Sequence, residues 1–452
     1  MKRLKKIQYL SLKALAVCLL VLPVSCASWK NLPAQTEELA LAPSSSGILK
    51  EVEQAVLGGK GEKQSAFLLL ERNEEALNWR LALADHATSS IDAQYYIWDS
   101  DESASLMFER LMYAADRGVR VRVLLDDFSL SAKNKTLAAI SRYPNIELKI
   151  FNPSHVQRSN IGSLVEFILY FKELNRRMHN KMFVVDNRFA IVGGRNIGDA
   201  YFGLSEKYNN SDLDVLATGP VVPEVSASFD EYWNQSLAVP SWALSKRGTT
   251  EDVDELRANI MTTLQEAGEK ISSYPIAPKD WSSELHHLPG QMKYGTANFL
   301  QDDPGDVDDD LPRLLELIFD EVNPSEEEVR IVSPYFIPGD EFLKEVKHLV
   351  DQGIKVKFLT GSLGSNNHTV AHSHYKKYRR RILETGAELY EFRHDPSSEI
   401  RDASNVTPVV AQFISLHAKT IVGDRDRCFI GSLNLDPRSV VINTVVIPTV
   451  YI

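Results

Sequence analysis

Two segments of the chain carry the same polar residues at the same spacing. Each has a histidine, a lysine two positions later, an aspartate after four further residues and, after six more, a Gly-x-x-Asn sequence. The residues are His179, Lys181, Asp186 and Asn196 in the first copy, and His417, Lys419, Asp424 and Asn434 in the second. Because five fixed residue types recur in register, coincidence is excluded and both copies serve one function.

The spacing places complementary chemical groups side by side. Histidine and lysine at positions i and i+2 of a β-strand point to the same face, and the apolar residues 182–185 and 420–422 continue each strand. Two such copies around one pocket supply two imidazoles, two lysines and two amides. Cations and N–H donors hold the oxygens of a tetrahedral anion, and a neutral imidazole serves as nucleophile or acid. This set therefore predicts chemistry on a phosphate ester.

Metal binding by the two histidines is the alternative use of this pattern. The lysine beside each histidine argues against it, because a cation next to a metal ion is repelled. The sequence also has no cluster of carboxylates and histidines with ligand spacing. We therefore expect a site without metal or cofactor.

The strands that position these residues belong to a duplicated unit. Residues 90–98, a helical stretch and residues 119–123 form a β-α-β pattern, and residues 329–336, a helical stretch and residues 354–358 repeat it. The repeat predicts an α/β fold with two pseudo-symmetric halves. Each half is expected to be a mainly parallel sheet covered by helices, with one active site shared between the halves.

A targeting segment is predicted at the N-terminus. The first 25 residues hold five basic side chains and no acid, residues 14–24 are an unbroken apolar run, and small residues precede Cys26. The run is short for a membrane span, which needs about 20 residues. The pattern is typical of a signal peptide followed by a lipidated cysteine, which predicts an exported, periplasm-facing lipoprotein. An uncleaved anchor in the inner membrane is the alternative.

Composition and charge narrow the class of protein. Apolar residues make up 44% and charged residues 25% of the 452 residues, which is typical of a globular protein with a large core. Three cysteines exclude a disulfide framework. The formal charge is −11, and −16 without the first 25 residues. Such an acidic body disfavours nucleic acid as a partner.

The N-terminal segment, the two repeated units and the residues between them are expected to divide the chain into five parts. Residues 253–271 show the periodicity of an amphipathic helix, and the acidic stretch 302–310 is typical of a solvated loop. The predicted parts are a signal peptide (1–25), a lipidated N-terminus and tether (26–60), a first half (61–245), a linking helix with the acidic loop (246–310) and a second half (311–452).

The paired motif resembles the signature of the phospholipase D superfamily. Residues 174–181, 193–202, 211–215 and 436–439 look like its bacterial cardiolipin synthase branch, and the resemblance extends over residues 65–444. It implies a metal-independent, two-step phosphatidyl transfer through a phosphohistidine. The implied partners are the bacterial membrane and phospholipid substrates, with phosphatidylglycerol and phosphatidylethanolamine as candidates.

The resemblance also implies a role for each residue. His179 would attack phosphorus, while His417 would act as general acid and base. Asp212 matches the family's orienting carboxylate and would fix the tautomer of His179. The phosphoryl oxygens would be held by Lys181, Lys419, Asn196 and Asn434. Structural support of the site is expected from Asp186 and Asp424.

The second half departs from the family near its end. The chain has Asn-Thr-Val at 443–445 where the family has Asn-x-Glu, so the carboxylate expected to orient His417 is absent. A helix corresponding to residues 223–233 would fall beyond position 452. We therefore expect lowered activity and solubility, and an inactive membrane-anchored member stays open beside phosphatidyl transfer. Hydrolysis at the same site also stays open, whereas the export signal and acidic charge disfavour a nuclease.

Three further features bear on the substrate and its binding. Residues 164–171 are strongly apolar and belong either to the core or to a lip that touches acyl chains. Basic side chains gather at 376–381, as a solvated face or as a surface that docks on anionic lipid. His372 and His374 are candidates to reach the phosphate pocket.

Overall fold

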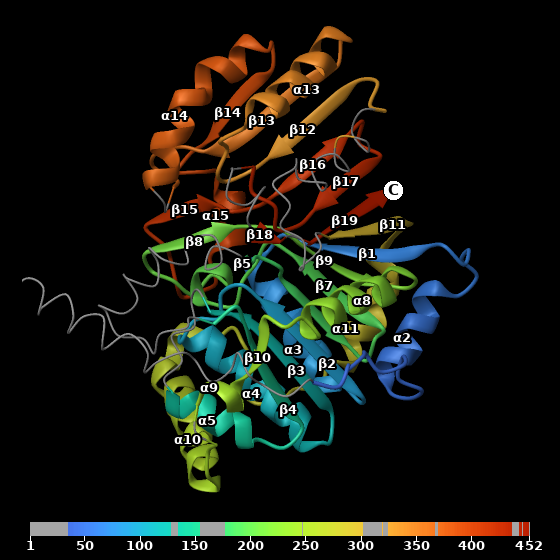
Figure 1. Cartoon of the computed structure of the whole chain (residues 1–452), viewed down its shortest axis with the longest axis vertical. Coiled ribbons are helices and arrows are strands. Elements are labelled where there is room, and N and C mark those ends of the chain that lie inside the picture. The colour runs from blue at the N-terminus through green and yellow to red at the C-terminus, as the bar shows by residue number, and fades with distance from the viewer. Residues whose placement is uncertain are drawn as a thin grey trace, which may run out of the picture.

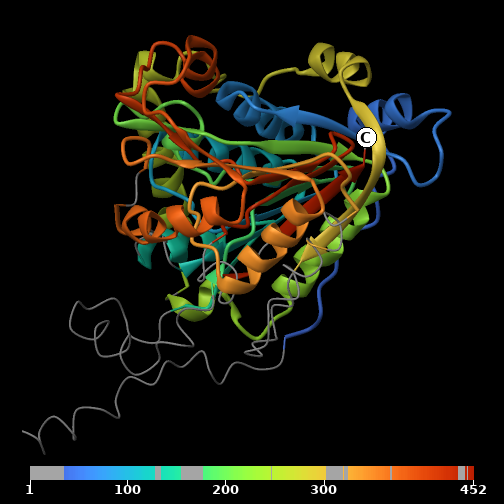
Figure 2. The same ribbon diagram turned by 90° about the horizontal axis from the view of Figure 1, so that it is seen from above.

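Two α/β halves share one continuous sheet (Figure 1). The computed structural model describes residues 35–127, 134–153, 177–245, 247–301, 319, 324–366, 369–435, 443–444 and 446–451. Fifteen strands follow one another in the order β10-β4-β3-β2-β6-β7-β9-β1-β11-β19-β17-β16-β12-β13-β14. Seen from above, the strands run through the middle of the molecule with helices on both sides (Figure 2).

The first half begins with helix α2 and ends with α9. Its strands are β1 (Ser65–Leu70), β2 (Ser90–Tyr95), β3 (Arg120–Asp126), β4 (Ile146–Phe151), β5 (Arg177–Met178), β6 (Met182–Val185), β7 (Phe189–Gly193), β8 (Tyr208–Ser211), β9 (Asp214–Thr218) and β10 (Ala238–Pro240). Its helices are α2 (Ile48–Leu57), α3 (Asn73–His86), α4 (Glu102–Asp116), α5 (Asn134–Arg142), η3 (Asp199–Tyr201), α8 (Val221–Trp233) and α9 (Ser241–Leu244).

A helical link leads to the second half. The link holds α10 (Thr250–Ala267), η4 (Gly268–Ile271), α11 (Ser282–His287) and η5 (Leu288–Gly290). The strands that follow are β11 (Lys293–Gln301), β12 (Glu328–Val332), β13 (Lys355–Gly361), β14 (Glu388–Phe392), β15 (Phe413–Leu416), β16 (Thr420–Gly423), β17 (Arg427–Ile430), β18 (Asn443–Thr444) and β19 (Val446–Tyr451). Their helices are α13 (Asp340–Asp351), α14 (Thr369–Glu384) and α15 (Ser398–Ser404).

The α/β class and the two halves are confirmed, but the sheet is mixed rather than mainly parallel. Within this fifteen-stranded sheet, parallel pairing of the described strands is confined to β2-β3-β4 and β12-β13-β14, the strands that the β-α-β units connect. The strands around both motifs pair antiparallel because short turns join them: β6 returns as β7, and β16 returns as β17. Asp186 and Asn187 adopt left-handed backbone (φ 55° and 51°), as do Asp424 and Arg425 (φ 49° and 69°), which permits these tight turns.

The two halves meet at the centre of the sheet. β1 pairs antiparallel with β11, and each is flanked by its own half's strand, β9 or β19. β19 thus takes in the second half the place that β9 takes in the first. Apolar residues of α3, α4 and α10 cover the first half, where Leu77, Leu111 and Leu264 are fully buried.

The chain contacts the body from residue 35, where Gln35 accepts from Lys149, so residues 35–57 of the segment predicted as lipidated N-terminus and tether (26–60) pack on the first half. The amide N–H of Ala40 donates to Asp230 (2.7 Å), and Trp233 donates its indole N–H to Glu38 (2.8 Å). Leu49, on α2, is fully buried in the core. In the described part of the chain, no helix combines the length and the apolar character that crossing a bilayer requires.

Candidate active site

Two short strand pairs bring the motifs of the two halves together. β15, which leads into His417, pairs in parallel with β8, which leads into Asp212. In the same way β5, which leads into His179, pairs in parallel with β18 of the other half. Each histidine therefore leaves a strand that is paired with a strand from the opposite half.

Asp212 is hydrogen-bonded to His417 of the other half, which corrects the prediction that Asp212 orients His179. Its Oδ2 lies 2.5 Å from Nδ1 of His417, and the amide N–H of His417 donates to Ser211 O (2.9 Å). The reason is the pairing of β8 with β15, which sets position 212 beside position 417. Burial opposes ionisation of Asp212, but His417 and Lys419 hold the pKa of this carboxyl well below its ordinary value.

The sequence had suggested that His417 lacks an orienting carboxylate. The structure shows the opposite, because Asp212 is hydrogen-bonded to it. Burial and Lys419 lower the pKa of His417 to about 4, although Asp212 opposes this shift. The ring of Tyr201 stands edge-on to it at 5.2 Å between centroids. This imidazole is thus fixed in orientation by a buried, ionised partner.

His179 has a neutral partner instead. Its Nδ1 lies 2.9 Å from the backbone oxygen of Ser432, and its ring packs on Tyr96 with centroids 4.7 Å apart. Among the described residues, no carboxylate is hydrogen-bonded to this ring. Burial, followed by the charges of Lys181 and Lys419, lowers the pKa of His179 well below its ordinary value.

The sequence register explains the difference between the two histidines. Thr444 of β18 pairs with Met178 as Ser211 of β8 pairs with Leu416. In sequence, position 445 thus corresponds to Asp212, and it is a valine. Val445 itself lies outside the described residues. The chain therefore lacks the acid that would be the partner of His179, as Asp212 is the partner of His417.

Both motif lysines are buried in this pocket. Lys181 Nζ donates to the backbone oxygen of its own histidine, His179, at 2.5 Å. Lys419 Nζ donates to the backbone oxygen of His417 and lies 3.1 Å from its Nδ1. Burial and the nearby Lys419 lower the pKa of Lys181 well below its ordinary value. The pocket concentrates positive charge where a tetrahedral anion can compensate it.

The two asparagines differ in what they can offer. Asn196 accepts from the amide N–H of Ile97 (3.0 Å) and donates to the hydroxyl of Tyr201 (2.9 Å), so it holds a loop beside His417. Asn434 is buried, and its Oδ1 has no partner among the described residues. Asn434 is therefore better placed than Asn196 to serve a ligand.

Asp186 and Asp424 anchor strands at a distance from the pocket. Asp186 accepts from the amides of residues 88, 89 and 90, at the start of β2. Asp424 does the same for the amides of residues 326, 327 and 328, at the start of β12. These contacts match the structural support expected of both residues.

Other candidate features lie elsewhere or are outside the described residues. His372 is buried against Tyr375 and its Nδ1 lacks a partner among the described residues, whereas His374 is exposed. The basic side chains of α14 are partly neutralised, since Arg379 pairs with Glu391. The positions outside the described residues are Cys26, the apolar run 164–171 and the acidic stretch 302–310.

Sequence reasoning missed Tyr96, Tyr201 and Ser432, which touch the two histidines. Tyr96 had a sequence signal, because it directly follows β2, the strand that pairs with β6. A backbone oxygen such as that of Ser432 has none. The described residues also contain no group of three or more metal-ligating side chains. The side chains that meet at the site are two imidazoles, two ammonium groups and the carboxylate of Asp212, a set that can accommodate a tetrahedral anion.

The chain is similar in sequence to cardiolipin synthases. The chain matches the family described as "Cardiolipin synthase, PLD-like domain" over residues 81–233 and 318–448. It is 36% identical to cardiolipin synthase C of Escherichia coli over 84% of this chain and 80% of that protein. It is 24% identical to cardiolipin synthase 2 of Staphylococcus epidermidis over 81% of this chain and 60% of that protein.

A solved structure supports the fold. The crystal structure of phosphatidylserine synthase from Haemophilus influenzae superposes with a TM-score of 0.56 at 16% identity, covering 89% of this chain and 86% of that one. This likeness concerns the architecture of two fused halves alone. With the family match and the 36% identical relative, it leads to one conclusion: the chain belongs to the phospholipase D superfamily and is a cardiolipin synthase-like enzyme.

Proposed function

We propose that this enzyme forms cardiolipin by transferring a phosphatidyl group between phospholipids through a phosphohistidine. The observation that carries the proposal is the meeting of His179 and His417, from opposite halves, with both motif lysines in one buried pocket. The cardiolipin synthases among its relatives support the choice of substrate class.

The partners of the two histidines favour different roles. A backbone carbonyl only accepts hydrogen bonds, so the contact with Ser432 O keeps the proton of His179 on Nδ1 and leaves a lone pair on Nε2. His417 donates its Nδ1 proton to ionised Asp212, which favours the imidazolium form against burial and the charge of Lys419, and the negative charge of a bound phosphodiester favours this form further. We therefore assign nucleophilic attack to His179 and proton transfer to His417.

The reaction follows in two balanced steps. The Nε2 lone pair of His179 forms a bond to phosphorus, the bond from phosphorus to the leaving oxygen breaks, and His417 gives that oxygen a proton. His417 then takes the proton of an acceptor hydroxyl, which attacks phosphorus and releases His179. Lys181 and Lys419 neutralise the phosphoryl oxygens in both steps.

Export and attachment by lipid at Cys26 form part of the proposal. The supporting evidence is the sequence pattern at the N-terminus. Gln35, the first described residue, accepts from Lys149, and eight residues lie between it and Cys26. The nine steps from Cα to Cα span at most about 30 Å, so a lipid at Cys26 would keep residue 35 within about that distance of the bilayer that holds the substrates.

Lipid analysis tests the function directly. The full chain is expressed in bacterial cells that lack cardiolipin, and the extracted lipids are separated by chromatography. Cardiolipin is expected with the wild type and with the control His374→Ala, but not with His179→Ala or His417→Ala. EDTA should leave the activity of the membranes unchanged. Phosphatidic acid in place of cardiolipin would show hydrolysis, and zinc-reversible inhibition by EDTA would refute the phosphohistidine mechanism.

A further inference from the structure

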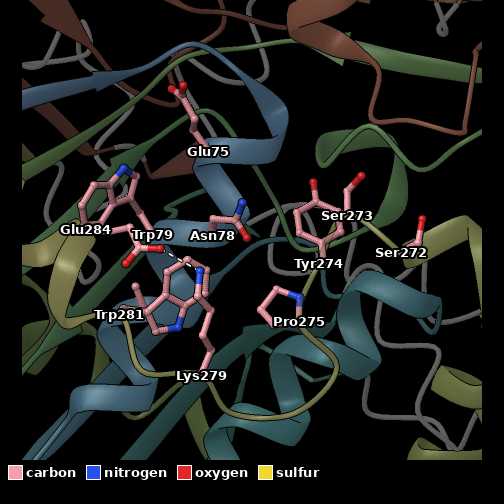
Figure 3. A pocket seen from close by; sticks show the side chains of 11 residues that line it. Glu75, Asn78, Trp79, Ser272, Ser273, Tyr274, Pro275, Lys279, Trp281 and Glu284 are labelled. Carbon is pink, nitrogen blue, oxygen red and sulfur yellow. Dashed lines mark hydrogen bonds and ion pairs between the residues drawn. The ribbon is translucent and has the colours of Figure 1, made fainter.

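A second hollow lies on the first half, between α3 and residues 272–284 (Figure 3). Its volume is about 470 Å³, within the range of small-molecule sites. No residue of the two histidine motifs lines it. The hollow is thus separate from the catalytic pocket, and the following argument does not depend on phosphatidyl transfer.

Three aromatic side chains form its walls: Trp79, Tyr274 and Trp281. The hydroxyl of Tyr274 donates to Phe202 O (2.7 Å), and the indole N–H of Trp281 donates to Asp85 (2.8 Å). Because these polar ends are already bonded to protein, the two rings offer the hollow their apolar surfaces. Such surfaces suit the C–H faces of a flat or ring-shaped ligand.

One polar group in the lining has no protein partner. Oδ1 of Asn78 is buried from solvent and accepts no hydrogen bond from the described residues. Figure 3 shows its amide between the side chains of Trp79 and Tyr274. A buried acceptor without a donor is unfavourable, so a ligand that brings a hydroxyl or N–H group would be stabilised here.

The ionised side chains of the lining, Glu75, Lys279 and Glu284, each have a partner of opposite charge, and Glu75 Oε1 lies 3.9 Å from Nε of Arg72. Lys279 Nζ lies 2.7 Å from Glu284 Oε1 and 4.2 Å from the centroid of the Trp281 ring. This lysine is the one cation among the lining residues of the hollow, so no unpaired cation is present there to hold a phosphate or carboxylate. A cationic ligand would compete with Lys279 for the face of the Trp281 ring and would be repelled by its charge. The lining therefore favours a neutral ligand.

We propose that this hollow binds a neutral, polyhydroxylated ring such as a pyranose sugar. Its C–H face lies against Trp79 or Tyr274, and one of its hydroxyl groups donates to Asn78. For a ligand of about a dozen non-hydrogen atoms, the expected Kd is on the order of 1 mM.

Titration of the full chain in detergent tests the proposal. The probes are methyl β-glucopyranoside, glycerol 3-phosphate and choline, each followed by calorimetry and by the fluorescence of the tryptophans. Saturable binding of the glucoside is expected, with at least tenfold weaker binding in Asn78→Leu and Trp79→Ala. Trp242→Ala, which removes an exposed tryptophan outside the hollow, is the matched control and should bind as the wild type does.

Each other outcome overturns the proposal. Stronger binding of glycerol 3-phosphate would show an anion site, and stronger binding of choline would show a cation site. No saturation by the glucoside up to 100 mM, or equal binding by both variants with wild-type melting temperatures, would show that the hollow does not hold such a ring. If Trp79→Ala fails to fold, Asn78→Leu alone decides, because it keeps the size of the side chain.

Discussion

Replacing Asp212 by asparagine removes a charge from the site and keeps its shape. The amide oxygen of asparagine can still accept from Nδ1 of His417, which now lies 2.5 Å from the carboxylate. The negative charge that stabilises the imidazolium is lost. Two unit charges about 4 Å apart interact by about 4 kcal/mol at an effective dielectric constant of 20. Proton transfer by His417 should therefore slow by about 10³-fold.

Substrates with different leaving groups show whether Asp212 assists proton transfer by His417 or nucleophilic attack by His179. A phospholipid releases an alkoxide that needs a proton, whereas bis(p-nitrophenyl) phosphate releases a phenolate that leaves without one. Asp212→Asn should lower kcat about 10³-fold on phosphatidylglycerol in mixed micelles, and less than tenfold for the first release of p-nitrophenolate. Asp426→Asn, on the exposed turn after the second motif, is the control and should lose nothing on either substrate.

Two results would refute the reasoning. An equal loss on both substrates would mean that Asp212 acts on the attacking histidine, His179, despite the observed contact. A loss of less than tenfold on the phospholipid would mean that His417 does not depend on this carboxylate for its proton.

Further predictions concern stability, attachment and the missing acid. The pKa of His417 is lowered to about 4, so the unfolded chain binds more protons between pH 6.5 and 4; acidification through this window should destabilise the fold by about 3 kcal/mol, and His417→Gln should flatten the dependence of the urea midpoint on pH. Asp186→Ala leaves three strand amides without their acceptor and should cost about 3 kcal/mol or more in urea unfolding, while a change below 1 kcal/mol would argue against an anchoring role. Cys26→Ser should abolish labelling with radioactive palmitate, and an unlabelled wild type would indicate an uncleaved anchor instead. Val445→Glu places an acid at the position that corresponds to Asp212, next to the strand pair that carries His179. It should raise the pKa of His179 and move the acidic limb of the kcat profile to higher pH, and an unmoved limb would show that position 445 does not reach this ring.

The paired motifs and the two halves were predictable because they depend on local pattern and on repetition. The constant spacing of the copies required two equivalent units. The motif histidines and lysines, predicted to lie within one strand, instead lie in the short breaks between β5 and β6 and between β15 and β16. The mixed sheet was missed because the β-α-β units determine only the parallel strands. The tight turn at Asp186 and Asn187, which creates antiparallel neighbours, depends on left-handed backbone that the hydrophobic pattern does not reveal.

The assignment of Asp212 failed for a tertiary reason. Within one half, Asp212 follows its motif closely in sequence, so His179 seemed to be its natural partner. The pairing of β8 with β15 instead carries it to His417, which is 205 positions away. Which strand of the other half lies beside a given strand is set by packing of the whole sheet, and a single sequence holds no periodic signal for it.

The pairing of strands from opposite halves gives different surroundings to two histidines that occupy the same position in the repeated motif. Each leaves a strand of its own half and is bonded by a residue of the other, so neither half can hold a complete site. The sequences then break the symmetry: an aspartate follows β8, whereas a valine follows β18. The histidine beside the aspartate is stabilised when it carries a second proton, as an acid must. The histidine beside the carbonyl of Ser432 is stabilised in the neutral form with Nε2 unprotonated, as a nucleophile must be. Under the proposed mechanism, the carboxylate of Asp212 serves the acid–base step and the nucleophile needs none, so we expect the valine at 445 to be compatible with activity.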